Sequence, residues 1–205
     1  MILGFDTETS GLPNFHEPSD DPGQPHLLQI AAALYDLAGR EVHRLSTIVK
    51  PGEGCVIHPK ALEAHGITLE RAHAEGADPV QVARDFIEMA RQATLIVGHN
   101  VSFDVRIKRI HAARHLGFKW DKPAPTFCTM YKSTGFTRIP ATEAMRASGR
   151  FGFKVPSLME AHQHFFGEGF DGAHDAVADV EASMRIFWHL VREKGVPMFK
   201  AEAAA

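Results

Sequence analysis

The chain begins with Met1-Ile2-Leu3-Gly4-Phe5-Asp6-Thr7-Glu8, an apolar run that ends in two carboxylates. The five residues before Asp6 have the composition of a short buried strand. Side chains alternate along a strand, so we expect Asp6 and Glu8 to share one face while Thr7 turns away. Two carboxylates one pleat apart repel each other, and a hard divalent cation between them is the usual solution. An isolated Asp-x-Glu is more often a pair of surface acids, but here the apolar run draws the pair toward the core.

The rest of the chain alternates between strand-like and helix-like segments. Further strands are predicted at 27–35, 41–50, 94–98 and 126–130, and helices at 60–65, 79–92, 102–115, 156–166 and 176–194. Residues 13–25 form a Pro- and Asp-rich surface loop, and residues 131–155 follow no clear pattern. Three adjacent strands followed by alternating helices and strands predict an α/β fold with a mixed sheet. We expect one domain over residues 1–195 and a short tail over 196–205.

Composition excludes several classes of protein. The 205 residues are 44% hydrophobic and 23% charged, which is typical of a globular domain. No apolar run approaches the roughly 20 residues that cross a bilayer, and the first ten residues lack the basic start of a signal peptide. Cys55 and Cys128 fit no zinc spacing, so we expect both to be reduced and packed. The expected location is cytoplasmic, with no membrane partner.

The net charge of -3 conceals an uneven distribution. Half of all Lys and Arg residues lie between Arg106 and Lys154, a stretch that holds only two acids, Asp121 and Glu143. A polyanion can bind such a stretch through phosphate contacts. A solvated face with counter-charges supplied from elsewhere in the fold explains it equally well.

A third carboxylate lies in Gly98-His99-Asn100-Val101-Ser102-Phe103-Asp104, where a strand gives way to a helix. Asp104 falls in the first helical turn. By itself it is explained as well by the helix dipole as by catalysis, with Asn100 or Ser102 as the N-cap.

A histidine and a fourth carboxylate lie in Gly172-Ala173-His174-Asp175-Ala176-Val177-Ala178-Asp179. Five helical positions separate His174 from Asp179 by roughly 140°, so both cannot share a helix face. We expect Asp175 as N-cap, His174 on the entering loop and Asp179 one turn into the helix. Taken alone, His174 is more simply an ordinary surface histidine.

Together, Asp6, Glu8, Asp104, His174 and Asp179 have the order and spacing of the DEDDh exonucleases, which this sequence resembles over about residues 1–192. Secondary matches lie between the motifs, at Gln29-Ile30, His65-Gly66-Ile67-Thr68, Cys128-Thr129-Met130 and Pro156-Ser157-Leu158. The resemblance implies a ribonuclease-H-like fold, a five-stranded mixed sheet with helices on both faces. It implies 3′→5′ removal of 5′-nucleoside monophosphates with two Mg²⁺ or Mn²⁺ ions per site.

The resemblance also assigns roles. The four acids would be metal ligands, directly or through water, and His174 the general base. The residues matched to contacts with the terminal nucleotide are Thr7, Gly11, Leu12, His65, Ile67, Asn100 and Phe103. Leu12 offers an apolar surface to the base, and Phe103 is either a stacking residue or a packing residue. Asn100 is explained equally well as a nucleotide contact and as a structural cap of the helix.

The predicted partner is a single nucleic-acid strand with a free 3′ end, DNA in preference to RNA. The motifs do not separate the two, because 2′-OH discrimination depends on pocket shape. The rival of another class is an inactive nuclease-like module that only binds a strand or a protein. Proofreading members of the family usually carry a polymerase-binding tail. The short end at Met198 to Ala205 and the long 13–25 loop favour a stand-alone repair or scavenging enzyme. Association with a polymerase is the alternative.

Overall fold

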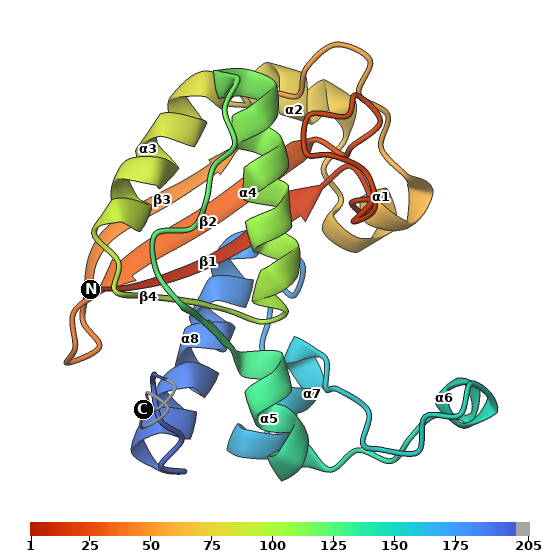
Figure 1. Ribbon diagram of the computed structural model, residues 1–205, viewed down its shortest axis with the longest axis vertical. Coiled ribbons are helices and arrows are strands. Elements are labelled where there is room, and N and C mark those ends of the chain that lie inside the picture. The colour runs from red at the N-terminus through yellow and green to blue at the C-terminus, as the bar shows by residue number, and fades with distance from the viewer. Residues whose placement is uncertain (200–205) are drawn as a thin grey trace, which may run out of the picture.

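The structure is a computed structural model that describes residues 1–199. Its centre is one five-stranded sheet in the order β3-β2-β1-β4-β5 (Figure 1). β1 pairs antiparallel with β2 and parallel with β4, β2 pairs antiparallel with β3, and β4 pairs parallel with β5. The strands are β1 (Ile2–Thr9), β2 (Leu27–Tyr35), β3 (Glu41–Ile48), β4 (Leu95–Gly98) and β5 (Thr126–Cys128).

Helices cover both faces of this sheet, as predicted. They are α1 (Pro59–His65), α2 (Leu69–Glu75), α3 (Pro79–Arg91), α4 (Val101–Leu116), α5 (Thr129–Thr137), α6 (Glu143–Ala147), α7 (Leu158–Phe166) and α8 (Ala176–Arg192). α3 and α4 lie on one face and α8 on the other (Figure 1). Within the described residues, no helix combines the length and apolar character that a membrane crossing requires.

The odd-numbered residues of β1 build the core under α3 and α4. Leu3 and Phe5 are fully buried there, and the rings of Phe5 and Phe86 lie 5.0 Å apart. In α3, Val82, Phe86 and Ala90 recur every four residues and therefore form one apolar stripe. Burying each large side chain of this kind stabilises the fold by about 1.5–3 kcal/mol.

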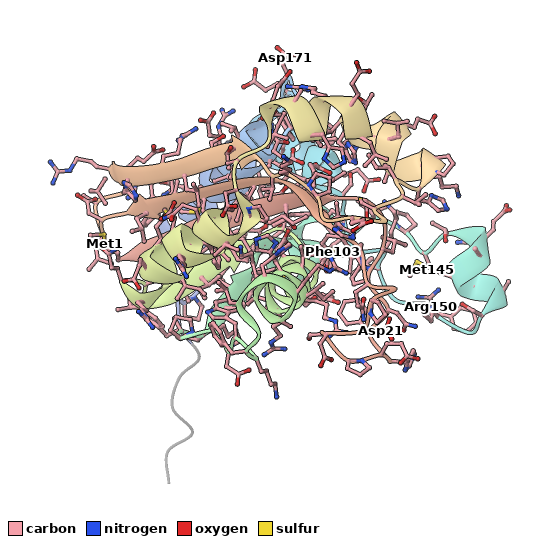
Figure 2. All side chains as sticks on the ribbon, turned by 90° about the horizontal axis from the view of Figure 1, so that it is seen from above. Met1, Asp21, Phe103, Met145, Arg150 and Asp171 are labelled. Atoms are coloured by element: carbon pink, nitrogen blue, oxygen red, sulfur yellow. The ribbon has the colours of Figure 1, made fainter. Side chains whose placement is uncertain are left out.

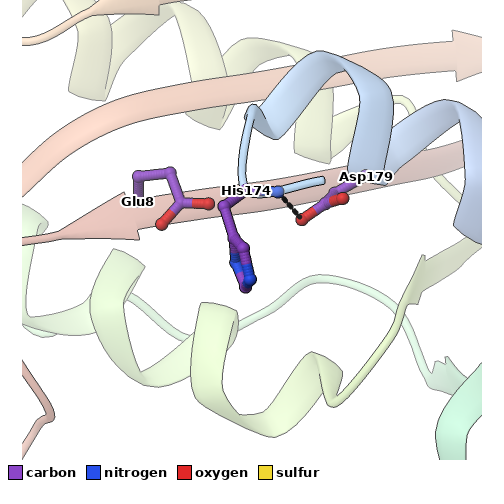
Figure 3. Close-up of side chains that lie close together, drawn as sticks. All are labelled: Glu8, His174 and Asp179. Carbon is purple, nitrogen blue, oxygen red and sulfur yellow. Dashed lines mark hydrogen bonds between the residues drawn. The ribbon is translucent and has the colours of Figure 1, made fainter. Parts of the chain in front are cut away.

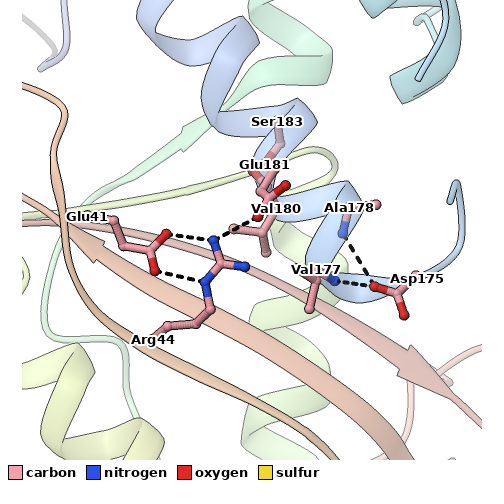
Figure 4. Close-up of polar contacts among 8 residues, drawn as sticks. All are labelled: Glu41, Arg44, Asp175, Val177, Ala178, Val180, Glu181 and Ser183. Atoms are coloured by element: carbon pink, nitrogen blue, oxygen red, sulfur yellow. Dashed lines mark hydrogen bonds and ion pairs between the residues drawn. The ribbon is translucent and has the colours of Figure 1, made fainter. Parts of the chain in front are cut away.

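The even-numbered side of β1 faces α8. A Cβ atom on Gly4 would lie 2.7 Å from the Sδ atom of Met184, so the helix crosses the strand where the strand has no side chain. β3 holds the same helix through Arg44, which pairs with Glu41 at 2.6 Å and with Glu181 of α8 at 2.8 Å (Figure 4). The position of α8 over β1 is therefore set by close packing and by an ion-pair network.

Several predicted boundaries were wrong. β1 runs to Thr9 instead of ending at residue 5, because the polar residues after the apolar run still pair with β2. β5 ends at Cys128, and the next residue begins α5. α2 was not predicted, and residues 131–155 contain most of α5 and all of α6. Both cysteines are free, as expected.

The 13–25 loop lies on the surface as predicted, but it is organised around one buried side chain. The Gln24 amide accepts from the Asn14 N–H at 3.0 Å and donates to the carbonyl oxygens of Asn14 and Pro18. Arg106 donates to Ser19 Oγ and to loop carbonyls, and Arg114 donates to the carbonyls of the last two loop residues. Two cations of the basic stretch therefore hold this loop against α4.

Candidate active site

The first two carboxylates lie inside β1, two residues apart. Asp6 and Glu8 continue the row that faces α8, and Thr7 continues the row that faces α4. The prediction that the acids share a face and Thr7 turns away is confirmed. Thr7 has a partner on that other face, because its hydroxyl donates to Asp104 Oδ1 at 2.8 Å.

Asp104 reaches the site from the first turn of α4. The helix is preceded by Asn100, which has a left-handed backbone with φ of 69° and makes no side-chain cap bond. This conformation turns the chain sharply from β4 into the helix. Asp104 is consequently buried at the edge of the sheet beside Thr7. Asn100 occupies the predicted N-cap position, but its side chain does not cap the helix.

The last motif folds as predicted. Asp175 is the N-cap of α8 and accepts from the N–H groups of Val177 and Ala178 (Figure 4). His174 lies just before it, exposed and with φ of 69°. Its N–H donates to Asp179 Oδ2 at 3.3 Å. A non-glycine residue in this region costs free energy, of order 1–3 kcal/mol, and such residues concentrate at functional sites.

Gln29 of β2 ties this loop to the sheet. It lies opposite Glu8 in the strand register. Its Nε2 donates to Asp175 Oδ2 at 3.1 Å, and its Oε1 accepts from Ala176 N–H at 3.3 Å. The start of α8 is thereby fixed beside the end of β1.

The fold brings three of the predicted groups together directly. Glu8, His174 and Asp179 each offer one ligand atom, and these atoms lie within 4.8 Å of one another (Figure 3). Asp104 and Asp6 are coupled to the same cluster, since the charge of Asp104 helps to raise the pKa of Glu8, and the charges of Asp179 and Glu8 help to raise the pKa of Asp6. All five motif residues therefore meet at one edge of the sheet.

The carboxyl groups of this cluster hold protons far more tightly than isolated acids. Burial, and next the charge of Asp179, raises the pKa of Glu8 to about 8. Burial also raises the pKa of Asp179 to about 6, against the opposing effect of the His174 N–H. Burial raises the pKa of both Asp6 and Asp104, and so do neighbouring charges, chiefly that of Asp104 on Asp6 and that of Asp179 on Asp104. Four acids in this setting do not all ionise unless positive charge is added.

The donor set fits hard divalent ions. Such ions prefer carboxylate oxygens, and the cluster offers four carboxylates and a neighbouring imidazole. Asp179 Oδ1 is buried and lacks a hydrogen-bond partner within residues 1–199, whereas an orphaned acceptor of this kind is costly. A bound cation would satisfy this oxygen and offset the repulsion.

A pocket of about 570 Å³ opens beside the acids. Of the predicted nucleotide contacts, five line it: Thr7, Gly11, Leu12, His65 and Phe103. Leu12 is 86% exposed, which leaves its apolar side chain free to contact a ligand. Helix α1 supplies the opposite wall, with His58, Lys60, Ala61 and Ala64. Only His65 of this helix was predicted from the sequence as a contact, because nothing in a short helix of mixed composition signals its place in the fold.

Two predicted contacts lie elsewhere. Ile67 is only 2% exposed and packs with Leu28 and Cys55 in a small core behind the pocket, so its side chain is a packing residue. Its N–H donates to His65 Nδ1 at 3.0 Å, and His65 Nε2–H donates to the Thr9 carbonyl at 3.1 Å. Burial lowers the pKa of His65 and favours this neutral form. Asn100 is not part of the pocket wall.

His99 is a structural residue that the motif analysis did not single out. Its Nε2–H donates to the Pro156 carbonyl at 3.0 Å, and its Nδ1 lies 3.0 Å from Thr129 Oγ1. Burial lowers the pKa of His99 to about 4, so the ring is neutral. The secondary sequence matches at Thr129 and Pro156 thus converge on one ring next to the second motif.

Residues 3–187 match the model of the RNase_T family, whose description is Exonuclease. The chain belongs to this exonuclease family. It is therefore a 3′→5′ exonuclease, and the resemblance to the DEDDh exonucleases is confirmed.

Related proteins agree with this assignment. The 3′-5′ DNA exonuclease Cap18 of Escherichia coli is 25% identical over 193 residues, which cover 91% of this chain and 89% of Cap18. The PolC-type DNA polymerase III of Streptococcus thermophilus is 35% identical over 112 residues, covering 54% of this chain and 7% of the polymerase. The match to Cap18 extends over nearly the whole of both chains, whereas that to PolC is confined to a small part of the polymerase.

Solved structures show the fold. Escherichia coli exonuclease I in complex with a dT13 oligonucleotide superposes with a TM-score of 0.71 at 20% identity, over 95% of this chain and 41% of exonuclease I. The zinc-bound form of its complex with single-stranded DNA gives a TM-score of 0.69. The chain spans less than half the length of exonuclease I. The predicted ribonuclease-H-like fold is confirmed.

Proposed function

We propose that this exonuclease removes 5′-nucleoside monophosphates from the 3′ end of single-stranded DNA, with two divalent ions held by Asp6, Glu8, Asp104 and Asp179. The observation that carries the proposal is the convergence of these four acids and His174 beside a pocket of nucleotide size. Two bound ions would activate the attacking water and offset the charge of the scissile phosphate. Mg²⁺ and Mn²⁺ both suit a site built from carboxylates.

His174 is proposed as the general base. Its exposed ring lies within reach of Glu8 and Asp179, and its backbone is held by the bond to Asp179 and by the cap at Asp175. The water oxygen bonds to the phosphorus, and its proton passes to the imidazole. The bond from phosphorus to the preceding 3′ oxygen breaks, and that oxygen takes a proton from solvent. The shortened strand and one 5′-monophosphate leave.

The pocket is proposed to hold the terminal nucleotide. Leu12 and Phe103 line it and offer two apolar surfaces between which a base fits without sequence preference. Gly11 lies on the same wall and leaves room for the sugar. Among the described residues that line the pocket, Lys60 of α1 brings the one lysine or arginine and Glu8 the one acid. A pocket of this size with one side formed by α1 suits a single terminal nucleotide, which agrees with exonuclease action.

DNA is favoured over RNA by the relatives. Cap18 is a DNA exonuclease, and the superposed exonuclease I structures contain DNA oligonucleotides. RNA trimming with the same chemistry is the alternative. The cellular setting, in repair or in replication with a polymerase partner, remains a prediction, as does the domain boundary at residue 195.

Digestion of end-labelled substrates tests the proposal. Matched single-stranded DNA, duplex DNA and RNA should be compared with Mg²⁺, with Mn²⁺ and with a chelator. We expect mononucleotides from the earliest time points on single-stranded DNA, and none from circular single strands or in chelator. Faster release from RNA would support the alternative substrate. Cutting of circular DNA would contradict an exonuclease, and inactivity with both metals would support a module that only binds.

A further inference from the structure

Residues 139–155 form an arm that leaves the body after α5 and returns before α7 (Figure 1). The arm carries α6 and is closed at its base by a hydrogen bond from Lys154 N–H to the Ile139 carbonyl at 2.9 Å. Its outer turn is closed by a bond from Arg150 N–H to the Met145 carbonyl at 2.9 Å. The arm, on which Met145 and Arg150 are labelled, projects from the side of the molecule (Figure 2). This segment therefore has a defined backbone but little support from the core.

The arm exposes large apolar side chains. Phe151 is 78% exposed and Phe153 is 50% exposed, in the sequence Arg150-Phe151-Gly152-Phe153-Lys154. Neither phenylalanine belongs to a core cluster among the described residues. Neighbouring exposed aromatic residues on a projecting segment mark a binding surface more often than a packing one.

The cations of the basic stretch are used differently in its two halves. On α4, Arg106 and Arg114 bind loop carbonyls, Lys108 is buried, and Arg109 pairs with Asp121. These groups are committed to the fold.

On the arm side, Arg138, Arg146 and Arg150 form no ion pair within residues 1–199. Lys154 alone is neutralised, by Glu160. The only acid of the arm itself is Glu143. Arg146 donates to the Ala141 carbonyl and Arg150 to Ser148 Oγ, both within the arm. Neither contact neutralises the guanidinium charge, so the arm carries a net positive charge.

The base of the arm adjoins the catalytic edge of the sheet. Pro156, the residue after the arm, accepts the hydrogen bond from His99, which follows β4 directly. The same turn leads into α4 and Asp104. The arm therefore begins beside the turn that carries the second motif.

We propose that the arm binds the single strand upstream of its 3′ end, with Phe151 and Phe153 stacking on bases and Arg146 and Arg150 contacting phosphates. Aromatic faces interleaved with cations are the usual means of holding a single strand without sequence preference. The charge of the arm favours a nucleic acid over an apolar protein partner. The inference rests on the proposed function, because it assigns the arm to the same substrate.

Strand binding measured without turnover tests the aromatic residues. Fluorescence anisotropy with a dye-labelled oligonucleotide of about 20 nucleotides, in chelator, should be compared for the wild type and the double variant Phe151→Ala/Phe153→Ala. We expect the Kd to rise roughly 10- to 100-fold, the scale of lost stacking. The variant Phe151→Trp/Phe153→Trp should keep the wild-type Kd. The matched control is Phe118→Ala, an exposed aromatic at the far end of α4, which should change nothing.

Charge reversal tests the arginines. Arg146→Glu/Arg150→Glu should weaken binding of the long strand. The slope of log Kd against log salt concentration should fall by the amount expected for the loss of about two phosphate contacts. The control Arg84→Glu/Arg91→Glu makes the same charge change on α3 and should leave the salt dependence unchanged.

Substrate length separates this proposal from the proposed function. With Mg²⁺, the arm variants should raise KM for the long strand at least tenfold while hydrolysis of a dinucleotide changes less than about twofold. Equal effects on both lengths, or wild-type binding of the long strand by both arm variants, would overturn the proposal. A third outcome would also overturn the proposal. If the wild type self-associates, and the aromatic variant no longer does so but still binds the strand normally, the arm binds a second copy of the chain. If the wild type hydrolyses neither substrate, the proposed function fails, but the chelator titration still decides the arm.

Discussion

Metal binding at the acid cluster should be strongly dependent on pH. Burial and neighbouring charge raise the pKa of Glu8 to about 8 and that of Asp179 to about 6. A divalent ion binds the ionised carboxylate, so any proton held there must leave first. Between pH 8 and pH 6, competition from the Glu8 proton weakens binding about fiftyfold and that from Asp179 about twofold. Asp6 and Asp104, whose pKa is also raised, add to the same effect. The affinity for Mg²⁺ should therefore fall by at least roughly 100-fold over this range.

Calorimetric titration with Mg²⁺ at pH 6, 7 and 8, at constant ionic strength, measures this effect. Repeating each titration in two buffers of different ionisation enthalpy gives the number of protons released. We expect more than one proton to leave at pH 6 and fewer at pH 8. Circular dichroism at each pH controls for unfolding.

The variant Glu8→Gln isolates the largest contribution. It should bind the ions more weakly at every pH, because one ligand is changed, yet its affinity should vary less between pH 6 and pH 8. An affinity of the wild type that is independent of pH, or a variant with an equally steep dependence, would refute the reasoning from buried and mutually repelling carboxyl groups.

Three further outcomes are expected. His174→Ala should lose roughly 10²–10⁴ in rate while keeping its Tm and Mg²⁺ affinity; turnover above about half that of the wild type would contradict the role of general base. Asp104→Asn should abolish Mg²⁺-dependent turnover. Thr7→Val, which removes the 2.8 Å hydrogen bond to that acid, should lower the steady-state rate about 10- to 100-fold. Equal losses in the two variants would show that Thr7 does more than position Asp104. Lys108→Met should raise the free energy of unfolding at pH 7 by about 1–4 kcal/mol, because the buried ammonium group has no hydrogen-bond partner within residues 1–199. Its contact with the Phe86 ring at 4.4 Å offsets only part of this cost. Burial lowers the pKa of Lys108 from 10.5 to about 7. The unfolded chain therefore holds the extra proton between these values, and wild-type stability should rise with pH through that window. Denaturant melts of both proteins at pH 7 and pH 9 test this, and a lower Tm of the variant at pH 7 would contradict it.

The exonuclease family and most of the architecture could be predicted from the sequence alone. The apolar run before Asp6 and the alternation through Glu8 predicted a buried strand with both acids on one face, because strand periodicity is a local property. Asp175 as N-cap, with His174 before it, likewise followed from local helix rules. The boundaries that failed, at the end of β1 and in residues 131–155, depend on pairing and packing with distant segments.

What only the tertiary structure decided is which residues meet. The wall of the pocket comes from α1, and Ile67 lies behind it instead of on it, because burial depends on how α1 and α2 pack against β2. His99 joins three separate segments through one neutral ring. The basic stretch is one feature in the sequence but two in the fold. Arg106 on α4 binds the 13–25 loop, whereas Arg146 and Arg150, among the described residues, make hydrogen bonds only within the arm. Contacts between distant residues leave no periodic signal in the chain, and for that reason they were visible only once it was folded.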